Sequence, residues 1–222
     1  MLTSEQMREL ASACVPRSYA RDNTLFLQDS QASGLYCIRQ GQVLLSQVDH
    51  FGNETAFRLA FGGEVIGYRS LFAEQPHAAT ARTLASTSVC FIPRSTIWGL
   101  RSRNHALDGS FLKALACDRG FADAPLLRNP LLPLRVRFAH LLTVLRAHLG
   151  HVEGEAVCYE IALTQRDTGA LLGARPETIA RMHRNFEEEG LCRFRRGEIQ
   201  ILNYAGVLEI IGLGGRPRHS QA

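Results

Sequence analysis

The spacing of apolar residues changes near Pro93, and this change predicts two structurally different halves. Before Pro93, short runs of aliphatic, aromatic and β-branched residues alternate with glycine-bearing turns, a pattern typical of β-strands. We expect strands over Thr24–Leu27, Gly34–Ile38, Val43–Val48 and Val89–Ile92. Glycines at intervals of roughly ten residues separate these runs, as in sandwiches and barrels of short strands. The N-terminal half is therefore predicted to be a small β-domain.

After Pro93 the apolar residues recur with the helical period of about 3.6 residues. One apolar stripe lies between residues 107 and 115, and a second amphipathic pattern runs from Leu134 to Leu149. Three prolines interrupt the helical pattern between these two segments, at positions 125, 130 and 133. Proline lacks the backbone N–H and clashes with the preceding turn of a helix. We therefore expect a hinge within residues 123–133.

Two helix boundaries can be placed closely in the C-terminal half. Thr164 and Asp167 have the spacing of a capping box, with Asp in place of the usual Glu or Gln, and predict a short helix that ends at Gly173. Pro176 stands where a first-turn proline is tolerated, so it opens a second helix, which Gly190 ends. The result is two helices joined by a turn of a few residues.

The sequence after these helices completes a known DNA-binding motif. Two short apolar runs, 191–194 and 199–202, predict a β-hairpin, and helix, turn, helix and hairpin together are typical of a winged helix-turn-helix. The second helix of such a unit enters the major groove of DNA with its N-terminal residues at the base edges. Arg181 can donate two hydrogen bonds to a guanine, and Glu177 can accept one from cytosine.

We expect further side chains of this unit to contact DNA. Arginine suits such contacts because its planar guanidinium binds phosphate or guanine with two parallel hydrogen bonds. The candidate DNA-contacting residues are Thr164, Gln165, Arg175, Glu177, Thr178, Arg181, Arg184, Arg195 and Arg196. Glu177 and Arg181 lie four positions apart, so a simple surface ion pair is an alternative interpretation of these two residues.

Composition and charge permit a nucleic-acid partner without requiring one. The 222 residues carry a formal net charge of +4, and 24 of the 25 basic residues are arginine. Genomic base composition can produce the same arginine bias. No apolar stretch approaches the roughly 18 residues of a membrane span, and the N-terminus lacks the pattern of a secretory signal. We expect a cytoplasmic protein with no membrane partner.

The six cysteines give no sign of a metal site. They stand at positions 14, 37, 90, 117, 158 and 192, with no CxxC pair and no histidine at zinc-finger spacing. We expect reduced thiols, as in other cytosolic proteins. An iron–sulfur cluster needs about four thiolates, several of them usually close together, so the spacing argues against a cluster.

Three stretches of the sequence match one known family. They are Leu35–Val43 (LYCIRQGQV), Gly62–Phe72 (GGEVIGYRSLF) and Arg175–Arg181 (RPETIAR). They resemble a strand-turn-strand, a phosphate-cassette region and a recognition helix of the Crp/Fnr family of bacterial transcription regulators. The resemblance covers nearly all of residues 15–211. It implies a homodimer that binds double-stranded DNA at an inverted repeat with TGA-like half-sites, and RNA polymerase as a partner if the protein is an activator.

The resemblance also implies the fold and the domain boundaries. The expected fold class is α+β, with an N-terminal antiparallel, jelly-roll-like β-roll, a dimerisation helix and a C-terminal winged helix-turn-helix. The expected segments are a β-roll sensor domain over 1–104, a dimerisation helix over 105–127, a hinge over 128–133, a winged helix-turn-helix over 134–214 and a flexible tail over 215–222.

The sequence departs from the cyclic-AMP-binding members of this family at the effector pocket. Those members place a glutamate for the ribose directly after the glycine here numbered Gly67, and an Arg-Ser pair for the phosphate. This chain has Tyr68 at the first place and Ala78-Ala79 at the second. A cyclic phosphate buried without a cation loses its charge-assisted hydrogen bonds, so cyclic AMP is disfavoured. The effector-pocket candidates are Gly67, Tyr68, Arg69 and Arg82.

The effector itself stays open. Fnr-type oxygen sensors gather several cysteines near the N-terminus, whereas only Cys14 precedes residue 37 here, so an iron–sulfur cluster is again disfavoured. A haem- or redox-sensing regulator of the same family is an alternative, because His50, His77, His105 or a cysteine could supply an axial ligand.

Two alternatives belong to other classes of protein. A cupin-type metal enzyme needs clustered histidine and carboxylate ligands, but the sequence has no HxH pair, and His148 and His151 lie outside the predicted roll. A cyclic-nucleotide-responsive adaptor would have no use for the arginines of the recognition helix and wing. We therefore predict a DNA-binding regulator without enzymatic activity.

Overall fold

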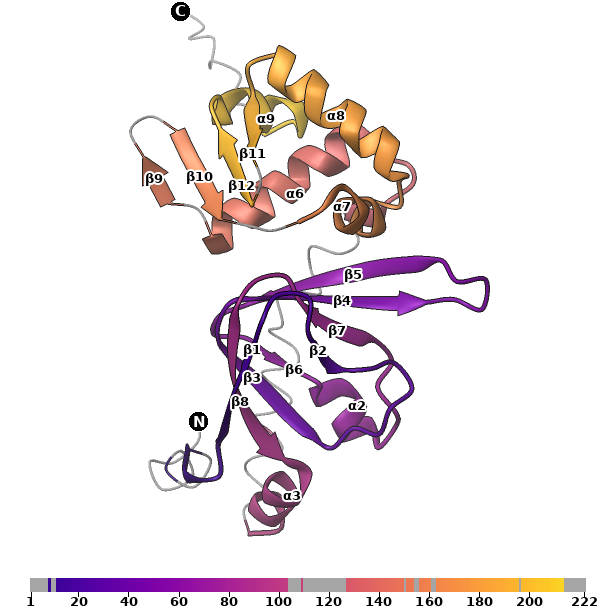
Figure 1. Ribbon diagram of the computed structural model, residues 1–222, viewed down its shortest axis with the longest axis vertical. Coiled ribbons are helices and arrows are strands. Elements are labelled where there is room, and N and C mark those ends of the chain that lie inside the picture. Colours follow the sequence, from indigo (N-terminus) through magenta and orange to yellow (C-terminus); the bar gives the residue numbers. More distant parts are fainter. Residues whose placement is uncertain are drawn as a thin grey trace, which may run out of the picture. The chain divides into compact units, whose positions relative to one another are not determined.

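The chain forms two compact units, which divide between residues 122 and 123 (Figure 1). The computed structural model describes residues 8, 11–103, 109, 127–149, 151–153, 156–160, 163–195 and 197–213. The first unit is built mainly of β-strands, and the second is built mainly of helices with one small sheet. The predicted α+β fold class, with a β-domain first and a helix-turn-helix last, is confirmed.

Two four-stranded sheets build the first unit, in the orders β1-β8-β3-β6 and β2-β7-β4-β5. All of their strand pairs are antiparallel. The strands are β1 Val15–Tyr19, β2 Thr24–Phe26, β3 Gly34–Gln40, β4 Gln42–Val48, β5 Glu54–Phe61, β6 Val65–Ile66, β7 Thr80–Thr83 and β8 Thr87–Pro93. Each of the four predicted runs overlaps a strand. The strands that the sequence missed are short or, like β5, depart from simple alternation of apolar and polar residues.

Two helices belong to the described part of this unit, α2 Tyr68–Ala73 and α3 Arg94–Arg103. Helix α2 follows Gly67, which has a φ of 85°. A Cβ there would lie 3.3 Å from the carbonyl oxygen of Gly34 and 3.5 Å from the His77 ring. Because the conformation is left-handed and the space is tight, this position favours glycine.

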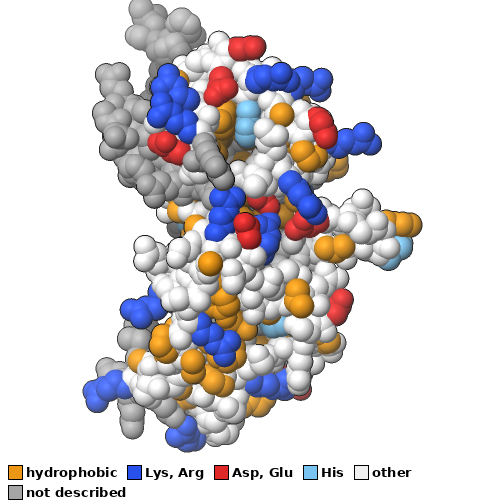
Figure 2. All heavy atoms as spheres, viewed as in Figure 1, with side chains coloured by type: hydrophobic (Ala, Val, Ile, Leu, Met, Phe, Trp, Pro, Cys, Tyr) orange, Lys and Arg blue, Asp and Glu red, His pale blue; other side chains and the backbone are white. Residues whose placement is uncertain are grey.

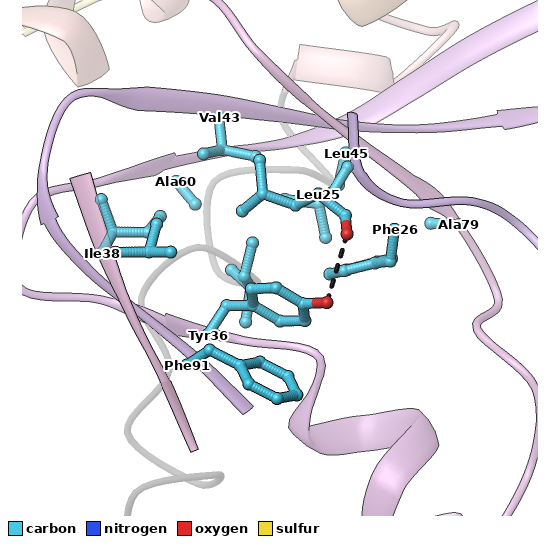
Figure 3. Close-up of a cluster of buried hydrophobic side chains, with 12 residues drawn as sticks. Leu25, Phe26, Tyr36, Ile38, Val43, Leu45, Ala60, Ala79 and Phe91 are labelled. Carbon is cyan, nitrogen blue, oxygen red and sulfur yellow. Dashed lines mark hydrogen bonds between the residues drawn. The ribbon is translucent and has the colours of Figure 1, made fainter. Parts of the chain in front are cut away.

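The core of the first unit lies between the two sheets. Figure 3 shows side chains of both sheets converging there, with Val43 and Ala60 fully buried. Tyr36 brings a polar group into this cluster, and its hydroxyl donates a hydrogen bond to the carbonyl oxygen of Leu25 at 3.2 Å. That bond offsets the cost of removing the hydroxyl from water. Burial raises the pKa of Tyr36.

A disulfide joins Cys14 to Cys90, so the expectation of reduced thiols is wrong for these two residues. The two cysteines are 76 positions apart in the chain, and their Cα atoms lie 5.3 Å apart. Pairing of β1 with β8 brings them together, and no local spacing could have indicated it. Cys37, opposite Cys90 on β3, remains a thiol, and burial raises its pKa.

The second unit contains four described helices and a four-stranded sheet of order β11-β12-β10-β9. The helices are α6 Leu134–Leu149, α7 Gln165–Leu172, α8 Pro176–Glu188 and α9 Tyr204–Ile210. The strands are β9 His151–Glu153, β10 Ala156–Glu160, β11 Cys192–Arg195 and β12 Glu198–Ile201. The predicted helix over 134–149 and the predicted helix-turn-helix with its hairpin are confirmed; the sequence missed β9, β10 and α9.

Helix α6 supplies the core on which this second unit is built. Phe138, Leu142 and Leu145 are buried on one face of the helix, as its apolar spacing predicts. The ring of Phe138 meets that of Phe186 edge-on, with centroids 4.9 Å apart. This contact connects α6 to α8, so the position of α8 depends on the packing of α6.

Several predictions concern residues outside the described ones. These are Pro125, Arg196, the tail 215–222 and the dimerisation helix 105–127 apart from Gly109 and Leu127. The predicted hinge 128–133 is described and contains a turn. There the Leu132 N–H donates to the carbonyl oxygen of Asn129 at 3.1 Å, and the Leu131 N–H donates to the Asn129 side chain at 3.0 Å. No described helix combines the length and the apolar character needed to cross a membrane.

Candidate nucleic-acid interface

The first helix of the motif starts with the predicted capping box. The Thr164 hydroxyl oxygen accepts a hydrogen bond from the Asp167 N–H at 3.1 Å, and the Thr164 N–H donates to the Asp167 carboxylate at 2.9 Å. Two N–H groups that a helix start leaves unpaired are thereby satisfied. Gly173 ends α7 in the left-handed conformation, with a φ of 62°. The start and the end of α7 are both as predicted.

The turn between α7 and α8 folds back closely against Gly169, which lies within α7. A Cβ at this position would lie 2.4 Å from the carbonyl oxygen of Ala174, far inside contact distance. The Ala174 N–H donates a hydrogen bond back to the Gly169 carbonyl oxygen at 2.9 Å. The close approach sets the path of the chain into α8, and only glycine leaves room for it.

Helix α8 has one face in the core and one face in solvent. Ile179 and Phe186 are fully buried, whereas Glu177, Arg181 and Arg184 are exposed. The three exposed residues are separated by four and three positions, so they share one helix face. In Figure 2 blue side chains project along the edge that α8 forms in Figure 1. The helix therefore presents charged side chains outward and is held by its apolar side.

Glu177 and Arg181 do not form an ion pair with each other. The structure describes both side chains, and no ion pair in the described part of the chain involves either one. The surface ion pair that the spacing allowed is therefore absent here. Both groups are available to an outside partner.

The other predicted contacts lie on the same unit. Thr164, Gln165, Arg175 and Arg195 are not buried, and Thr178 is only partly exposed. Each strand of the hairpin lies one residue closer to the turn than predicted, so Arg195 ends β11 opposite Glu198 at the start of β12. The start of α7, the face of α8 and the wing thus all carry polar or basic side chains.

The acidic run at the end of α8 is largely engaged with the unit itself. The Glu187 carboxylate accepts a hydrogen bond from the Phe194 N–H at 2.9 Å, which fixes the wing to α8. Glu189 pairs with both terminal nitrogens of Arg135, and this contact lowers the pKa of the Glu189 carboxyl. These carboxylates thus join the C-terminal end of α8 to the wing and to α6.

Two titratable groups lie at the inner side of α8: His183 on the helix itself and Cys192 on β11. The His183 ring stacks on Phe194 with centroids 4.0 Å apart, and burial lowers its pKa. Cys192 is buried in β11, and burial, with a smaller contribution from the Glu187 charge, raises the pKa of its thiol to about 12. A thiol with such a pKa is not reactive near neutral pH.

The structure does not gather the effector-pocket candidates into one cation site. Gly67 and Tyr68 are adjacent at the start of α2, but Arg69 is exposed, and Arg82 forms an ion pair with Asp22 at 2.8 Å. Of the two arginines considered as phosphate partners, one is thus exposed and the other is paired with a carboxylate. Nothing in their geometry supplies the charge that a cyclic phosphate needs.

Sequence reasoning missed one arginine near Tyr68. Arg58 is only 5% exposed on β5 and forms an ion pair with Glu64 at 2.7 Å. A second terminal nitrogen lies 3.5 Å from the Tyr68 hydroxyl. An arginine within the apolar run FRLAF was the available signal, because a buried charge requires a partner.

The histidines considered as haem ligands lie in different surroundings. His50 is exposed and lies against Phe51, whereas His77 is buried against Phe26 with ring centroids 3.8 Å apart. Burial lowers the pKa of His77. His105 lies outside the described residues. Among the residues that the structure describes, no three metal-ligating side chains come together.

The fold and the exposed helix define the class: an antiparallel β-domain and a winged helix-turn-helix in one chain. Residues 16–104 match the cyclic nucleotide-binding domain, and residues 136–210 match the Crp-like helix-turn-helix domain. The chain belongs to the Crp/Fnr family of DNA-binding transcription regulators, and the resemblance seen in the sequence is confirmed.

Similar proteins carry the names of regulators. The fumarate and nitrate reduction regulatory protein of Vibrio cholerae is 26% identical over 192 residues, which are 85% of this chain and 75% of that protein. The cyclic AMP receptor protein of Thermus thermophilus is 27% identical over 199 residues, 89% and 88% of the two chains. The relatives are transcription regulators and not enzymes, which confirms the prediction of a regulator over the enzyme alternative.

Solved structures share the fold. FixK2 from Bradyrhizobium japonicum superimposes with a TM-score of 0.75 at 21% identity, over 89% of this chain and 96% of that one. A CRP-family transcriptional regulator from Thermus thermophilus gives a TM-score of 0.73 at 18% identity, over 88% and 96%. At these identities the structures support the fold alone.

Proposed function

We propose that this regulator acts as a cytoplasmic homodimer on an inverted repeat with TGA-like half-sites, and that Glu177 and Arg181 read the bases. The observation that carries the proposal is the exposed face of α8, where Glu177, Arg181 and Arg184 stand without ion pairs in the described part of the chain. Arg181 would bind guanine through two hydrogen bonds, and Glu177 would accept from cytosine.

The remaining polar residues of the unit would bind the DNA backbone or flank the base readers. Arg175, Thr178 and Arg184 lie on or beside α8, and Thr164 and Gln165 lie at the start of α7. Arg195 and Arg196 of the wing would contact phosphate. Such contacts position the protein on the duplex and make its affinity depend on salt concentration.

A dimer explains how the hinge could control binding. Half-sites of a palindrome lie one turn of DNA apart, about 34 Å, so the two recognition helices must keep that spacing. A signal that changes residues 128–133 would change the spacing and hence the affinity. The signal can shift the spacing only if it binds one arrangement of the two recognition helices more tightly than the other. If the protein activates transcription, RNA polymerase is its second partner.

The effector is proposed to differ from cyclic AMP. One relative is named for cyclic AMP and another for fumarate and nitrate reduction, so the names suggest no common effector. At the place of the ribose-binding glutamate this chain has Tyr68, whose hydroxyl lies near Arg58, and Arg58 is already paired with Glu64. The β-roll would then respond to another signal or to none.

The direct test is DNA binding by Arg181→Ala. We expect the variant to lose about 1–3 kcal/mol of binding free energy per half-site and to lose discrimination at one base pair. Fluorescence anisotropy on a TGA-containing palindrome and on single-base variants measures both. Arg146→Ala is the matched control, because it removes the same charge from the last turn of α6. If Arg181→Ala binds as tightly as the parent, the residue does not read DNA.

A further inference from the structure

We infer that Arg137 is a positioning residue for DNA recognition, because its guanidinium joins the predicted hinge to the helix-turn-helix. Its Nε donates a hydrogen bond to the carbonyl oxygen of Leu132 at 3.2 Å, and its Nη1 donates to the carbonyl oxygen of Leu172. Leu132 belongs to the segment before α6, and Leu172 is the last residue of α7. One side chain thus bonds to both segments. The inference rests on the proposed function.

Both acceptors are backbone carbonyl groups, and the one at Leu172 needs a donor from outside its helix. The last four carbonyls of a helix have no partner within it, and Leu172 holds the last of them in α7. The same end carries the negative pole of the helix dipole, which favours a cation. A guanidinium has five N–H donors in a planar fork and can serve two separated oxygens at once, which an ammonium group does less well.

The bond to Leu172 acts where the path into the recognition helix is set. Gly173 follows directly, and the tight contact of Gly169 with Ala174 fixes the turn into α8. On the other side, Leu132 closes the turn that starts at Asn129. A displacement of residues 128–133 would therefore strain the hydrogen bond from Arg137 to Leu132 and, through the same guanidinium, the bond to Leu172 that holds the end of α7.

A second arginine on the same helical turn holds the far end of the motif. Arg135 pairs with Glu189 at the end of α8, and its guanidinium lies over the Phe186 ring at 5.2 Å. The first turn of α6 therefore contacts the C-terminal ends of both helices of the motif. Of these two arginines, Arg137 is the one whose side chain also bonds to the hinge in the described part of the chain, at Leu132. It is thus the residue through which the hinge can set the spacing of the two recognition helices in a dimer.

The test is the dependence of affinity on half-site spacing. The full-length protein is titrated with palindromic duplexes of TGA-like half-sites at the one-turn spacing and with one or two base pairs added or removed. For Arg137→Gln we expect roughly tenfold weaker binding at the best spacing, as for loss of hydrogen bonds from a charged group, and less than about threefold change at the others. Arg146→Gln, on the same helix with the same change of charge, should keep the parental profile, because it packs over Tyr204 instead.

Other outcomes overturn the inference. An equal loss at every spacing would mean that Arg137 merely stabilises the fold. A fall of about one in the slope of log affinity against log salt would mean that Arg137 binds a phosphate directly. If the parent itself shows no spacing preference, the dimeric recognition in the proposed function fails, and the inference fails with it. Thermal melting checks folding, and Arg137→Lys, which keeps the charge but not the fork, should give a partly flattened profile if Arg137→Gln does not fold.

Discussion

The β-roll and the recognition helix differ in how their arginines are paired. In the β-roll, three arginines form ion pairs within the unit: Arg58 pairs with Glu64 at 2.7 Å, Arg82 with Asp22 at 2.8 Å, and Arg94 with Glu74 at 3.2 Å. In the winged helix, Arg175, Arg181 and Arg184 are exposed at α8, and no ion pair in the described part of the chain involves them.

This difference indicates what each unit can recognise. DNA attracts a protein through arginine and lysine charges that the protein does not neutralise itself, and only the second unit presents such a surface along one helix of the described residues. The roll instead uses these charged pairs within its own structure. Function is therefore readable from the outer face of one unit but not of the other.

The largest expected effect is on the stability of the roll. Arg58→Met removes one partner of a buried ion pair and leaves Glu64 without its cation, which should lower the free energy of unfolding of this unit by about 3–5 kcal/mol. Trp98, the single tryptophan of the chain, lies in α3 and reports unfolding of the first unit in urea.

A matched variant of the second unit completes this comparison. Arg184→Ala should change stability by no more than about 0.5 kcal/mol, yet lower the salt dependence of DNA binding by about one charge. The double variant Arg58→Met/Glu64→Met should recover much of the stability, because no charge is then left unpaired. Equal stability losses for Arg58→Met and Arg184→Ala would contradict the division between the units.

The second effect concerns sulfur chemistry and again separates the units. The Cys14–Cys90 disulfide closes a long loop in the roll, so Cys14→Ser should lower the stability of that unit by about 2–4 kcal/mol. A reductant should do the same to the parent, and urea unfolding followed by Trp98 fluorescence measures both. The second unit should not respond, because Cys192 is a buried thiol. If Cys14→Ser unfolds at the same urea concentration as the parent, and both Cys14 and Cys90 of the parent react with an alkylating reagent, the disulfide does not form.

The two units also differ in how much of their structure the sequence predicts. The helix-turn-helix was predicted nearly residue by residue because its signals are local: the capping box at Thr164, the glycine at 173 and the proline at 176 each act within a few residues. The roll was predicted only as four strands and a class. Its remaining strands are short or buried on both faces, so they lack the alternation that marks a half-exposed strand.

The site residues follow the same rule. Glu177 and Arg181 could be named because a helix face follows from spacing alone. Arg58 was missed although an arginine within the apolar run FRLAF marks it. Arg137 and the disulfide could not be named, since their partners lie far along the chain or are backbone carbonyls whose position only the folded structure defines. A sequence predicts which side chains lie on the exposed face of a helix more readily than which groups contact each other in the folded protein.

Helix starts provide a third, smaller test of the contrast. Helix α7 has a full capping box, whereas α2 in the roll begins at Gly67 without a side-chain cap. Thr164→Ala should therefore lower the stability of the second unit by about 1 kcal/mol, and Thr164→Ser should keep most of it, because serine also caps. Hydrogen exchange of the α7 amides measures this loss. If both variants exchange alike, the cap contributes nothing here, and any effect on DNA binding belongs to contact with DNA.

The smallest expected effect is a common response of the two units to acid. Burial lowers the pKa of His77 in the roll and of His183 on α8, so protonation of either ring disfavours the folded state. Between the folded and the unfolded pKa the unfolded chain binds more protons, and stability falls as the pH decreases. The stabilising contribution is complete above the usual histidine pKa of about 6.5 and is lost below it.

His77→Gln should flatten this pH dependence of stability when Trp98 fluorescence is followed, and His183→Gln should flatten it in the hydrogen exchange of the α8 amides. If His77→Gln instead flattens the response of α8, the two units are coupled, and the division drawn from their arginines does not extend to their stability.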